Sequence, residues 1–368
     1  MTTSIDVSVL VTTFRRPRHL ALVLESLALQ QCAHTTLEVI VSDDGSNDET
    51  AQLVRRFAAT AAFPLRFTSQ PHDGFRLARV RNEAARISRG RYLMFLDGDC
   101  MVPRHHVAAH VARRRLGTAL LGYCGLLTES ASRLLVPENL AATDLAALVP
   151  ASQRRSLARR RLKARWHAAV RHPTKPRLAG GDFGVWRDDF VRVNGFDERF
   201  VGWGQEDDDL GLRLRAAGVR LETILDRTCS LHVWHETDPT ATRRWKDGAN
   251  VSYFGRRGRL TACRQGLVAR PASALTWGLP CDLADSPLGR ALAPHLQAAR
   301  FAGAGEPCDI DLVIRPGKGV FSRPAECRLA IVANGCQPDA TLVATADQIV
   351  TVTEIDEPAL VAALAAAG

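Results

Sequence analysis

The sequence predicts an α/β protein with a mostly parallel central sheet and helices on both faces. Over the first hundred residues, short apolar runs alternate with segments whose apolar residues recur at helical spacing, and this alternation is typical of βαβ units. Three of the apolar runs are followed directly by polar or acidic side chains. Ligands of open α/β sheets bind beyond the carboxyl ends of the strands, so these three places are the first candidates for a site.

Four short apolar runs are expected to form strands, because each is bounded by residues that are typical of turns. They are residues 7–11, 37–41, 65–68 and 92–96. Helices are expected between them, around residues 20–27 and 77–87 and also from the point where Ser46 and Glu49 have the spacing of a capping box. A helix near residues 103–116 and a strand near residues 120–127 continue the alternation.

Regular signals weaken after residue 127 and return in an arginine-rich segment that is expected to be a helix. Another helix is expected to follow the acidic segment from Gly202 to Asp209. Beyond about residue 266 prolines become frequent, and the end of the chain is expected to form a small separate α/β unit. Its strands are predicted near residues 310–314, 329–333 and 349–352, followed by an alanine-rich helix after Asp356.

The composition is that of an ordinary globular protein, with 46% hydrophobic and 24% charged residues in a chain of 368. No apolar run reaches the roughly 18 residues that a membrane span requires. The segment before the first predicted strand, Met1 to Asp6, is short and polar. It does not have the basic region and long apolar run of a signal peptide. We therefore expect a cytoplasmic protein. The nine cysteines are scattered and form no CxxC pair, which argues against a zinc site and a disulfide framework and favours reduced, mostly buried thiols.

The net charge of +9 is concentrated in one segment. Ten Lys or Arg residues and no Asp or Glu lie between Ala151 and Arg177. Nucleic acid is one partner that such a helix could bind, and an anionic membrane surface or an anionic acceptor is another. A solvated helix face is the simplest alternative. We prefer contact with the membrane surface or with an acceptor, through the stretch from Gln153 to Arg177.

Asp97-Gly98-Asp99 follows the last of the four predicted strands. Two carboxylates one residue apart at a strand end can bind a hard divalent cation, which would neutralise charge on a leaving diphosphate. A turn rich in Asp and Gly is common without any metal, so the motif alone is weak. Asp43-Asp44-Gly45-Ser46 is similarly weak alone; Asp44 could accept hydrogen bonds from a base or a ribose.

The segment Gly202-Trp203-Gly204-Gln205-Glu206-Asp207-Asp208-Asp209 is more specific. Four consecutive acids repel one another, although the dipole at a helix start lowers that cost. Trp203 between two glycines suggests an aromatic platform, and a carboxylate beside it could deprotonate a hydroxyl group. Asp208 and Asp209 are expected to be exposed or to cap the helix. Farther along, His232 and His235 lie near a predicted strand end, where one of them is a candidate metal ligand.

Together these motifs resemble the family-two glycosyltransferases of GT-A fold. The resemblance rests on residues 8–14, 41–46 and 95–99, and then on residues 180–187, 193–197 and 202–207. The second group of motifs is similar to the C-terminal catalytic region of β-1,4-galactosyltransferases and of bacterial polysaccharide-synthesising relatives. The resemblance covers roughly residues 7–256, with the motifs in the expected order and spacing.

The resemblance implies a domain at residues 1–265, made of a nucleotide-binding half (1–127), a basic variable segment (128–177) and an acceptor and catalytic half (178–265). Residues 266–368 have no implied role. For the site, it implies the following assignments. The nucleotide would be held by Thr12, Phe14, Asp44, Arg79, Arg81 and Asp97. The metal would be held by Asp99, with help from Asp97 and from one of His232 and His235. The donor sugar would contact Gly181, Asp182 and Trp203, while Glu206 would hydrogen-bond a sugar and Asp207 would be the general base.

The implied activity is an inverting, Mn²⁺- or Mg²⁺-dependent transfer of a sugar from a nucleotide-sugar donor, most commonly UDP-linked, to a saccharide or lipid-linked acceptor. Synthesis of bacterial surface polysaccharide or lipopolysaccharide would suit it. The chain departs from the family at Phe14-Arg15, often Tyr-Asn, and at Asp182, often Asn, which leaves the donor sugar open. A nucleotidyltransferase is one alternative, but Thr12 to Arg18 contains no glycine or lysine for a phosphate loop. A non-catalytic nucleic-acid or membrane-binding relative is another, but it would leave the acidic motifs without a purpose, so no nucleic acid is expected.

Overall fold

The computed structural model describes residues 4–236, 247–256, 260–271, 274–279, 300–303, 305–315 and 323–352, together with residues 290, 321, 358 and 362. The chain divides into two compact units, residues 1–250 and 251–368. This division lies 15 residues before the boundary that the sequence suggests. Within the described ranges, no helix is both long enough and apolar enough to cross a bilayer.

The first unit is built on a seven-stranded sheet with the order β3-β2-β1-β4-β8-β6-β9. Its strands are β1 (Val7–Thr13), β2 (Leu37–Asp43), β3 (Leu65–Ser69), β4 (Tyr92–Asp97), β6 (Thr118–Leu121), β8 (Asp182–Trp186) and β9 (Arg220–Thr223). Only β8 runs against its neighbours, since β4 and β6 both pair with it antiparallel while the other pairs are parallel. The predicted α/β class with a mostly parallel sheet is confirmed.

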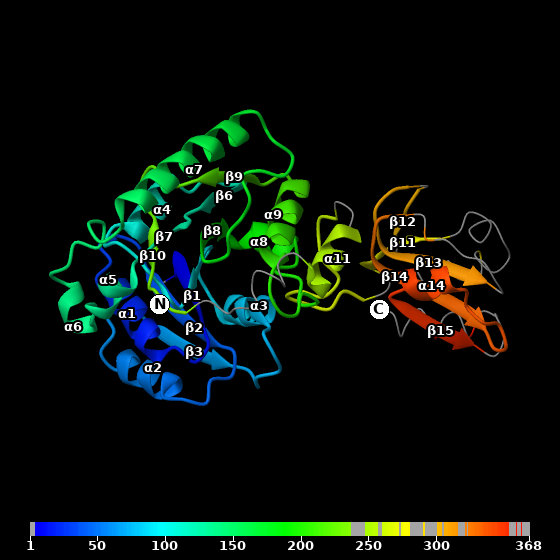
Figure 1. Cartoon of the computed structure of the whole chain (residues 1–368), viewed down its shortest axis with the longest axis horizontal. Helices are drawn as coiled ribbons and strands as arrows, with labels where there is room; N and C mark the ends of the chain where they lie inside the picture. The colour runs from blue at the N-terminus through cyan, green and yellow to red at the C-terminus, as the bar shows by residue number, and fades with distance from the viewer. Residues whose placement is uncertain are drawn as a thin grey trace. The chain divides into compact units, whose positions relative to one another are not determined.

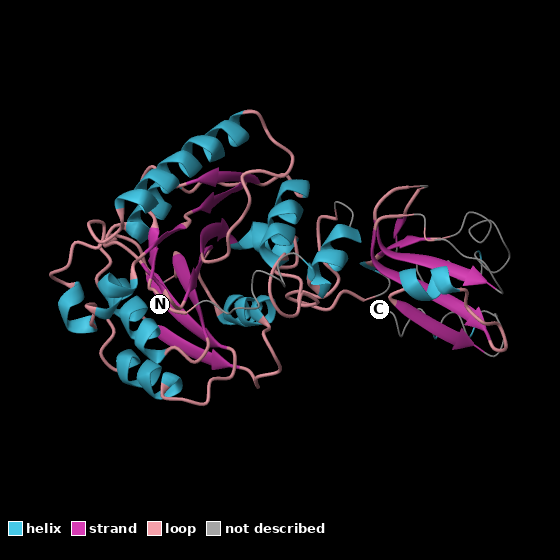
Figure 2. Cartoon of the chain, viewed as in Figure 1, coloured by secondary structure: helices cyan, strands magenta, loops and turns pink. Residues whose placement is uncertain are grey.

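Helices lie on both sides of this sheet (Figure 2). They are α1 (Pro17–Ala28), α2 (Thr50–Ala58), α3 (Leu77–Ile87), α4 (His106–Arg113), α5 (Glu129–Arg133), α6 (Pro137–Leu140), α7 (Ala151–Ala169), α8 (Arg187–Arg192) and α9 (Glu206–Ala216). On one face, alternate side chains of β1 such as Val9 and Val11 pack in a core with residues of α1. On the other, Phe95 of β4 stacks on Phe183 of β8, with ring centroids 4.6 Å apart.

A second, three-stranded sheet sets up the candidate site. It consists of β5 (Cys100–Met101), β10 (Ser230–His232) and β7 (Cys124–Leu126), with β10 in the middle. His232 is opposite Cys100 in the antiparallel pair, and the backbone N–H of Val233 donates to the carbonyl of Asp99 at 2.8 Å. This pairing brings the two histidines of residues 232–235 to the end of β4, more than a hundred residues earlier in the chain.

Two local predictions are wrong. The helix expected from Ser46 begins instead at Thr50 with no side-chain cap, because the Ser46 hydroxyl donates to Asp43 Oδ1 at 2.6 Å and accepts from the N–H of Arg15. The strand expected near residues 120–127 is split between β6 and β7, which belong to different sheets. The break falls at Gly122-Tyr123, where Tyr123 has a positive φ of 59° and a Cβ on residue 122 would collide with the Asp182 carboxylate.

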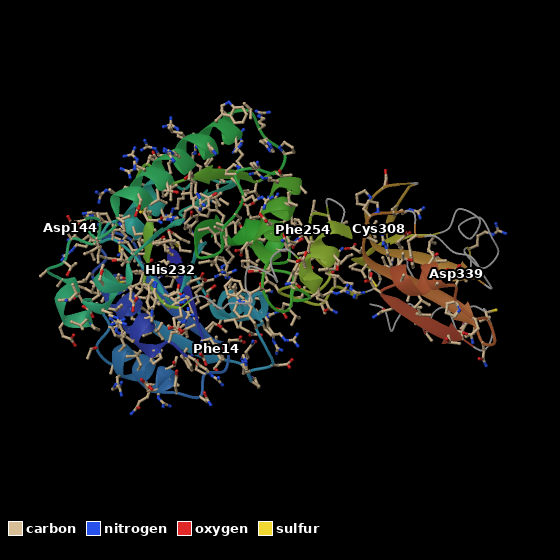
Figure 3. All side chains as sticks on the ribbon, in the orientation of Figure 1. Phe14, Asp144, His232, Phe254, Cys308 and Asp339 are labelled. Carbon is tan, nitrogen blue, oxygen red and sulfur yellow. The ribbon has the colours of Figure 1, made fainter. Side chains whose placement is uncertain are left out.

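The second unit contains a parallel sheet with the order β12-β11-β13-β14-β15. Its described elements are β11 (Thr276–Gly278), β12 (Arg300–Phe301), β13 (Cys308–Arg315), β14 (Ala325–Ala333), α14 (Ala340–Thr345) and β15 (Gln348–Val352), and α11 (Ala249–Arg256) begins at the division between the units (Figure 1). The three predicted strands are confirmed. Cys308 on β13 and Asp339, which caps α14, lie in this unit (Figure 3). The predicted alanine-rich helix falls almost wholly outside the described residues.

Candidate active site

Three metal-ligating side chains meet at the end of β4. Asp99 Oδ2 lies 3.3 Å from His235 Nε2, and Asp99 Oδ1 lies 3.6 Å from His232 Nε2. One ligand atom from each residue lies within 4.8 Å of the others, and all three side chains are partly accessible. The structure thus brings both histidines to Asp99, with His235 closer. Carboxylate and imidazole together form a donor set that suits a divalent transition metal.

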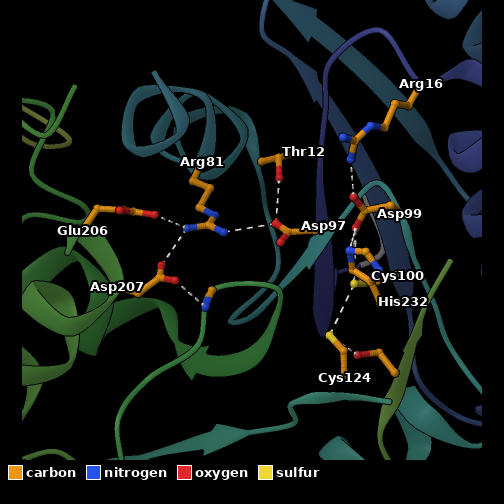
Figure 4. A network of polar contacts seen from close by, with 12 residues as sticks. Thr12, Arg16, Arg81, Asp97, Asp99, Cys100, Cys124, Glu206, Asp207 and His232 are labelled. Carbon is orange, nitrogen blue, oxygen red and sulfur yellow. Dashed lines mark hydrogen bonds and ion pairs between the residues drawn. The ribbon is translucent and has the colours of Figure 1, made fainter. Parts of the chain in front are cut away.

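Arg16 also reaches this cluster. Its Nη1 lies 2.7 Å from Asp99 Oδ2 (Figure 4). Burial alone would raise the pKa of Asp99, but the hydrogen bond from His235 and the positive charges of His232 and Arg16 hold that pKa well below its ordinary value. Asp99 is therefore ionised at neutral pH, which is the form that binds a metal.

The neighbouring carboxylate, Asp97, belongs to a different network. Its Oδ1 accepts from Thr12 Oγ1 at 3.2 Å and from Arg81 Nη2 at 3.1 Å. Burial raises the pKa of Asp97, and the charges of Asp99 and Asp207 add to the shift although Arg81 opposes it. The two acids of one motif therefore face different groups, since Asp99 faces His232 and Arg16 while Asp97 faces the guanidinium of Arg81 (Figure 4).

Arg81 joins Asp97 to the acidic segment at the start of α9. It is 2% exposed, and its Nη1 donates to Asp207 Oδ1 at 2.7 Å and lies 3.8 Å from Glu206 Oε1. A buried guanidinium needs such partners, because an unpaired charge in the interior is very costly. The charges of Asp207, Asp97 and Glu206 raise the pKa of Arg81 although burial opposes this, so it stays charged. Asp207 and Asp97, 110 residues apart in sequence, are thus tied through one side chain.

Asp207 is held from two sides. Besides Arg81, the backbone N–H of Gly180 donates to its Oδ2 at 2.8 Å. A Cβ on residue 180 would collide with both Asp207 and Arg81, so this close approach requires glycine. The acids lie in the first turn of α9, where the helix dipole favours negative charge. Asp209 is buried and pairs with Arg213 at 2.8 Å, and the N-cap of α9 is Gln205 with no side-chain cap, so the expectation that Asp209 is exposed or caps the helix is wrong.

Glu206 is buried in this network, and its Oε2 has no hydrogen-bond partner among the described residues. Burial, followed by the charge of Asp207, raises its pKa from 4.5 to about 8. The folded chain then holds a proton that the unfolded chain releases, so stability falls as the pH rises from 4.5 to about 8. In Glu206→Gln the free energy of unfolding should decrease less over this pH range.

Thermal unfolding of both proteins between pH about 5 and about 9 measures the effect. The midpoint of Glu206→Gln should exceed that of the wild type at the alkaline end and match it at the acid end. Glu138→Gln, which changes an exposed glutamate in α6, is the control and should follow the wild type. Parallel pH profiles for Glu206→Gln and the wild type would contradict the assignment.

The residues expected to hold the nucleoside are partly assembled. Asp44 is buried and accepts from Gln70 Nε2 at 2.6 Å, and burial raises its pKa. Phe14 stacks on His72 with ring centroids 4.4 Å apart and planes 13° from parallel. The sequence analysis missed His72 and Gln70, whose loop after β3 carries no recognisable motif. Arg79 lies on the exposed side of α3, unlike Arg81.

The three residues expected to contact the donor sugar have different surroundings. Gly181 lies against Asp97, since a Cβ there would come within 2.9 Å of the carboxylate. Trp203 is 39% exposed and stacks on Phe75, with ring centroids 5.2 Å apart and the planes parallel within 1°. The Asp182 side chain, in contrast, is 1% exposed and bonded inside the unit. Gly181 and Trp203 are therefore at least partly exposed, whereas Asp182 is buried.

Family models match this chain in two places. Residues 8–117 match the model of glycosyl transferase family 2. Residues 161–235 match the model described as the N-terminal domain of galactosyltransferase. The first match contains Thr12, Arg81 and Asp99, and the second contains Asp207 and both metal-site histidines. The resemblance found in the sequence is confirmed.

Individual relatives are similar over part of their length. Validoxylamine A glucosyltransferase from Streptomyces hygroscopicus subsp. limoneus is 32% identical over 250 residues, which is 62% of this chain and 52% of the relative. Chondroitin synthase from Escherichia coli is 25% identical over 231 residues, covering 59% of this chain and 33% of the relative. This chain thus spans about half or less of these relatives. A mannosyltransferase from Pyrobaculum calidifontis, solved with GDP-Man and Mn²⁺, has a TM-score of 0.47 at 20% identity and covers 66% of this chain and 61% of its own.

Proposed function

We propose that the chain, whose residues 8–117 match the model of glycosyl transferase family 2, is an inverting, metal-dependent glycosyltransferase that moves a sugar from a nucleotide-sugar donor to a hydroxyl acceptor. One observation carries the proposal. Asp99, which forms a candidate metal site with His232 and His235, is separated by one residue from Asp97, which Arg81 links to Asp207. A cation site and a fixed carboxylate are the two parts that such a transfer needs.

Asp99, His232 and His235 would hold the metal. Their chemistry fits one, since two imidazoles and an ionised carboxylate point their ligand atoms at a common space. Two nitrogen ligands favour Mn²⁺ over Mg²⁺, which prefers an all-oxygen shell. When bound, the metal would neutralise charge that develops on the departing diphosphate. Arg16, which already contacts Asp99, would add positive charge on the same side.

Asp207 is the proposed general base. Its carboxylate would accept the proton of the acceptor hydroxyl while the acceptor oxygen bonds to the anomeric carbon and the bond from that carbon to the diphosphate oxygen breaks. This single displacement inverts the configuration at the anomeric carbon. Arg81 and the N–H of Gly180 fix the orientation of the carboxylate, which matters because general bases act only within hydrogen-bond reach. Trp203 offers an exposed aromatic face on which a sugar ring would stack, and Glu206, protonated at neutral pH, would donate to a sugar hydroxyl.

The nucleotide would bind along the ends of β1 and β2, between Phe14, Thr12 and Asp44. A UDP-linked donor is the one that the family resemblance implies. One relative is a validoxylamine A glucosyltransferase, which supports a hexose as the transferred group. The alternative of a nucleotidyltransferase is not favoured, because Thr12 to Arg18 contains no glycine- and lysine-rich phosphate loop.

The acceptor is proposed to carry an anionic group, which helix α7 would bind. The helix lies along the outer edge of the first unit next to β9 (Figure 1). Between α7 and the segment that follows it lies a hollow of about 410 Å³. Its basic lining residues are Arg159, Arg160, Lys163, His167, Lys175 and Arg177. None of the described residues that line it is acidic, so its charge complements a phosphate or a carboxylate.

One residue that lines the hollow contacts the neighbour of the proposed base. Arg177 Nη1 lies 3.2 Å from Asp208, the residue next to Asp207. Tyr123 fixes the wall, because its hydroxyl donates to the Arg177 carbonyl at 2.6 Å and the Arg160 guanidinium lies 4.7 Å from the centre of its ring. An acceptor whose charged group bound here could therefore place a hydroxyl near Asp207.

The outer side of α7 supports peripheral contact with the inner face of the membrane, and hence a lipid-linked acceptor in surface polysaccharide synthesis. Leu162 and Trp166, one helical turn apart, are each 61% exposed, and Val170, another turn on, is 52% exposed. Arginines surround them. Exposed apolar and aromatic residues within a basic helix are typical of segments that lie in the interface of an anionic membrane.

Replacing Arg159 and Lys163 together by Gln should raise the KM for an anionic acceptor about tenfold or more, because each basic residue contributes about 1 kcal/mol of attraction. The KM for the donor should not change. Arg155→Gln with Arg165→Gln is the matched control, since it removes two exposed charges of α7 that lie outside the hollow. Equal effects of the two double variants on acceptor KM would contradict a specific anion site.

The membrane contact is tested separately by binding to vesicles that contain anionic lipid, which Trp166→Ser should weaken.

The transferase proposal itself is tested by nucleotide release over a panel of nucleotide sugars, with and without Mn²⁺. Metal-dependent turnover of one donor is the expected result and would also identify the sugar. Since some transferases turn over poorly without acceptor, calorimetric binding of each nucleotide is measured in parallel. If the chain showed no turnover of any donor and no metal-dependent binding of any nucleotide, the proposal would be overturned.

A further inference from the structure

A second group of metal-ligating side chains lies in the interior of the first unit, apart from the candidate active site. His106 and His110 are one turn apart on α4, and Asp182 begins β8. All three are at most 1% exposed. His106 Nε2 lies 3.2 Å and His110 Nε2 lies 3.8 Å from the same oxygen, Asp182 Oδ1. The three ligand atoms lie within 4.8 Å of one another.

Each of the three residues is oriented by a further contact on its other side. His106 Nδ1 lies 2.8 Å from Thr228 Oγ1, and His110 Nδ1 lies 3.5 Å from the hydroxyl of Tyr92. The second oxygen of Asp182 accepts from the N–H of Ser230 at 3.2 Å. Metal-binding histidines are typically held in this way, with the nitrogen that does not bind the metal fixed by an outer partner.

One atom of the group is left without a partner. His110 Nε2 is buried and makes no hydrogen bond within the described part of the chain, which is unusual for a buried polar atom. It faces the Asp182 carboxylate and His106.

We propose that His106, His110 and Asp182 form a buried structural zinc site. Bonds of about 2.0 to 2.1 Å in tetrahedral geometry place ligand atoms about 3.3 Å apart, and the spacings of 3.2 Å and 3.8 Å bracket that value. A fourth ligand is supplied by the second oxygen of Asp182 or by one water molecule. The sequence argument against zinc rested on the cysteines, and this site uses none.

The site would stabilise the part of the unit that supports catalysis. It connects α4 with β8, and through Ser230 with β10, which also carries His232. Asp182 directly follows Gly180 and Gly181, whose backbone lies against Asp207 and Asp97. Bound zinc would thus fix two segments that position active-site groups, without taking part in the reaction. The competing structure is an ion pair between a protonated His106 and Asp182, which needs no metal.

The experiment measures zinc in the full chain, purified without a histidine tag and dialysed against a chelator, by mass spectrometry. The variant Asp99→Ala is used throughout, so that the active-site metal does not contribute. One equivalent of zinc should remain in it and in Asp99→Ala with His105→Gln, which changes the exposed histidine next to His106. Adding His110→Gln instead should remove the zinc and lower the thermal midpoint.

A spectroscopic measurement covers the case in which His110→Gln does not fold. Asp99→Ala loaded with Co²⁺ in place of zinc should give the intense visible absorption of a four-coordinate ion. Absence of zinc from Asp99→Ala produced in zinc-supplemented medium would overturn the proposal, as would zinc that persists in a folded His110→Gln variant. Weak absorption typical of six-coordinate cobalt would overturn it as well. None of these outcomes bears on the transferase proposal, because sugar transfer is not the readout.

Discussion

Asp99→Ala is expected to abolish the metal-dependent release of nucleotide from the donor that the wild type turns over. Asp99 is the one carboxylate in the group with His232 and His235, and its removal would leave only the two imidazoles as ligands. A metal that stabilises a departing diphosphate contributes several kcal/mol to the transition state. Losing about 4 kcal/mol corresponds to about a thousandfold lower kcat. The variant is measured over rising Mn²⁺ concentration with saturating donor.

One control variant and two ligand variants distinguish a loss of metal binding from a loss of the fold. Asp188→Ala removes an exposed carboxylate in the first turn of α8 and should keep full activity. His235→Gln and His232→Gln each remove one candidate ligand and should raise the Mn²⁺ concentration needed for half-maximal rate. Because His235 is nearer to Asp99, at 3.3 Å against 3.6 Å, the larger shift is expected for His235→Gln. Unchanged metal dependence in Asp99→Ala would place the metal elsewhere.

Much of the first unit could be predicted because its information is local. The apolar runs that became β1, β2 and β4 are short and end in polar residues, and parallel strands bring their carboxyl ends to one edge of a sheet. That reasoning alone places Thr12, Asp44 and Asp99 at a common edge. The periodicity of residues 77–87 likewise predicts α3 with its bounds as observed.

The parts that escaped prediction depend on contacts between distant segments. The resemblance implied that one of His232 and His235 joins Asp99, but nothing in the sequence near β10 indicates the pairing with β5 that brings His232 there. The failure at residues 120–127 has the same origin, because a Cβ at Gly122 would collide with the carboxylate of Asp182, a residue 60 positions away in the sequence. Asp182 itself illustrates the limit, since its motif suggests a sugar contact while its burial beside His106 and His110 is visible only in three dimensions. Arg81 was predicted as a nucleotide contact, but its link to Asp207 required the fold.

The ion pair between Arg81 and Asp207 holds the proposed base in place, so a change at Asp207 is expected to affect the rate of transfer strongly. Asp207→Asn is expected to lower kcat for transfer by a factor of about 10² to 10⁴, the range that a general base typically contributes, while the KM for the donor stays near that of the wild type. Asparagine keeps the size and shape of the side chain. Because Arg81 and the N–H of Gly180 donate to different oxygens of Asp207, the single amide oxygen can keep only one of these two hydrogen bonds. The substitution therefore removes the basic group and one of the contacts that orient it.

The matched control is Asp208→Asn, one residue along the same helix turn. Asp208 pairs with Arg177 at the hollow beside α7, so this variant should affect the KM for an anionic acceptor but not the rate of the chemical step. Single-turnover kinetics with saturating acceptor separates the two, and nuclear magnetic resonance of the product tests for inversion at the anomeric carbon. A kcat near that of the wild type in Asp207→Asn would remove it from the role of base. Retention of configuration would exclude a single displacement altogether, because in a single displacement the hydroxyl attacks the anomeric carbon from the face opposite the diphosphate and inverts its configuration.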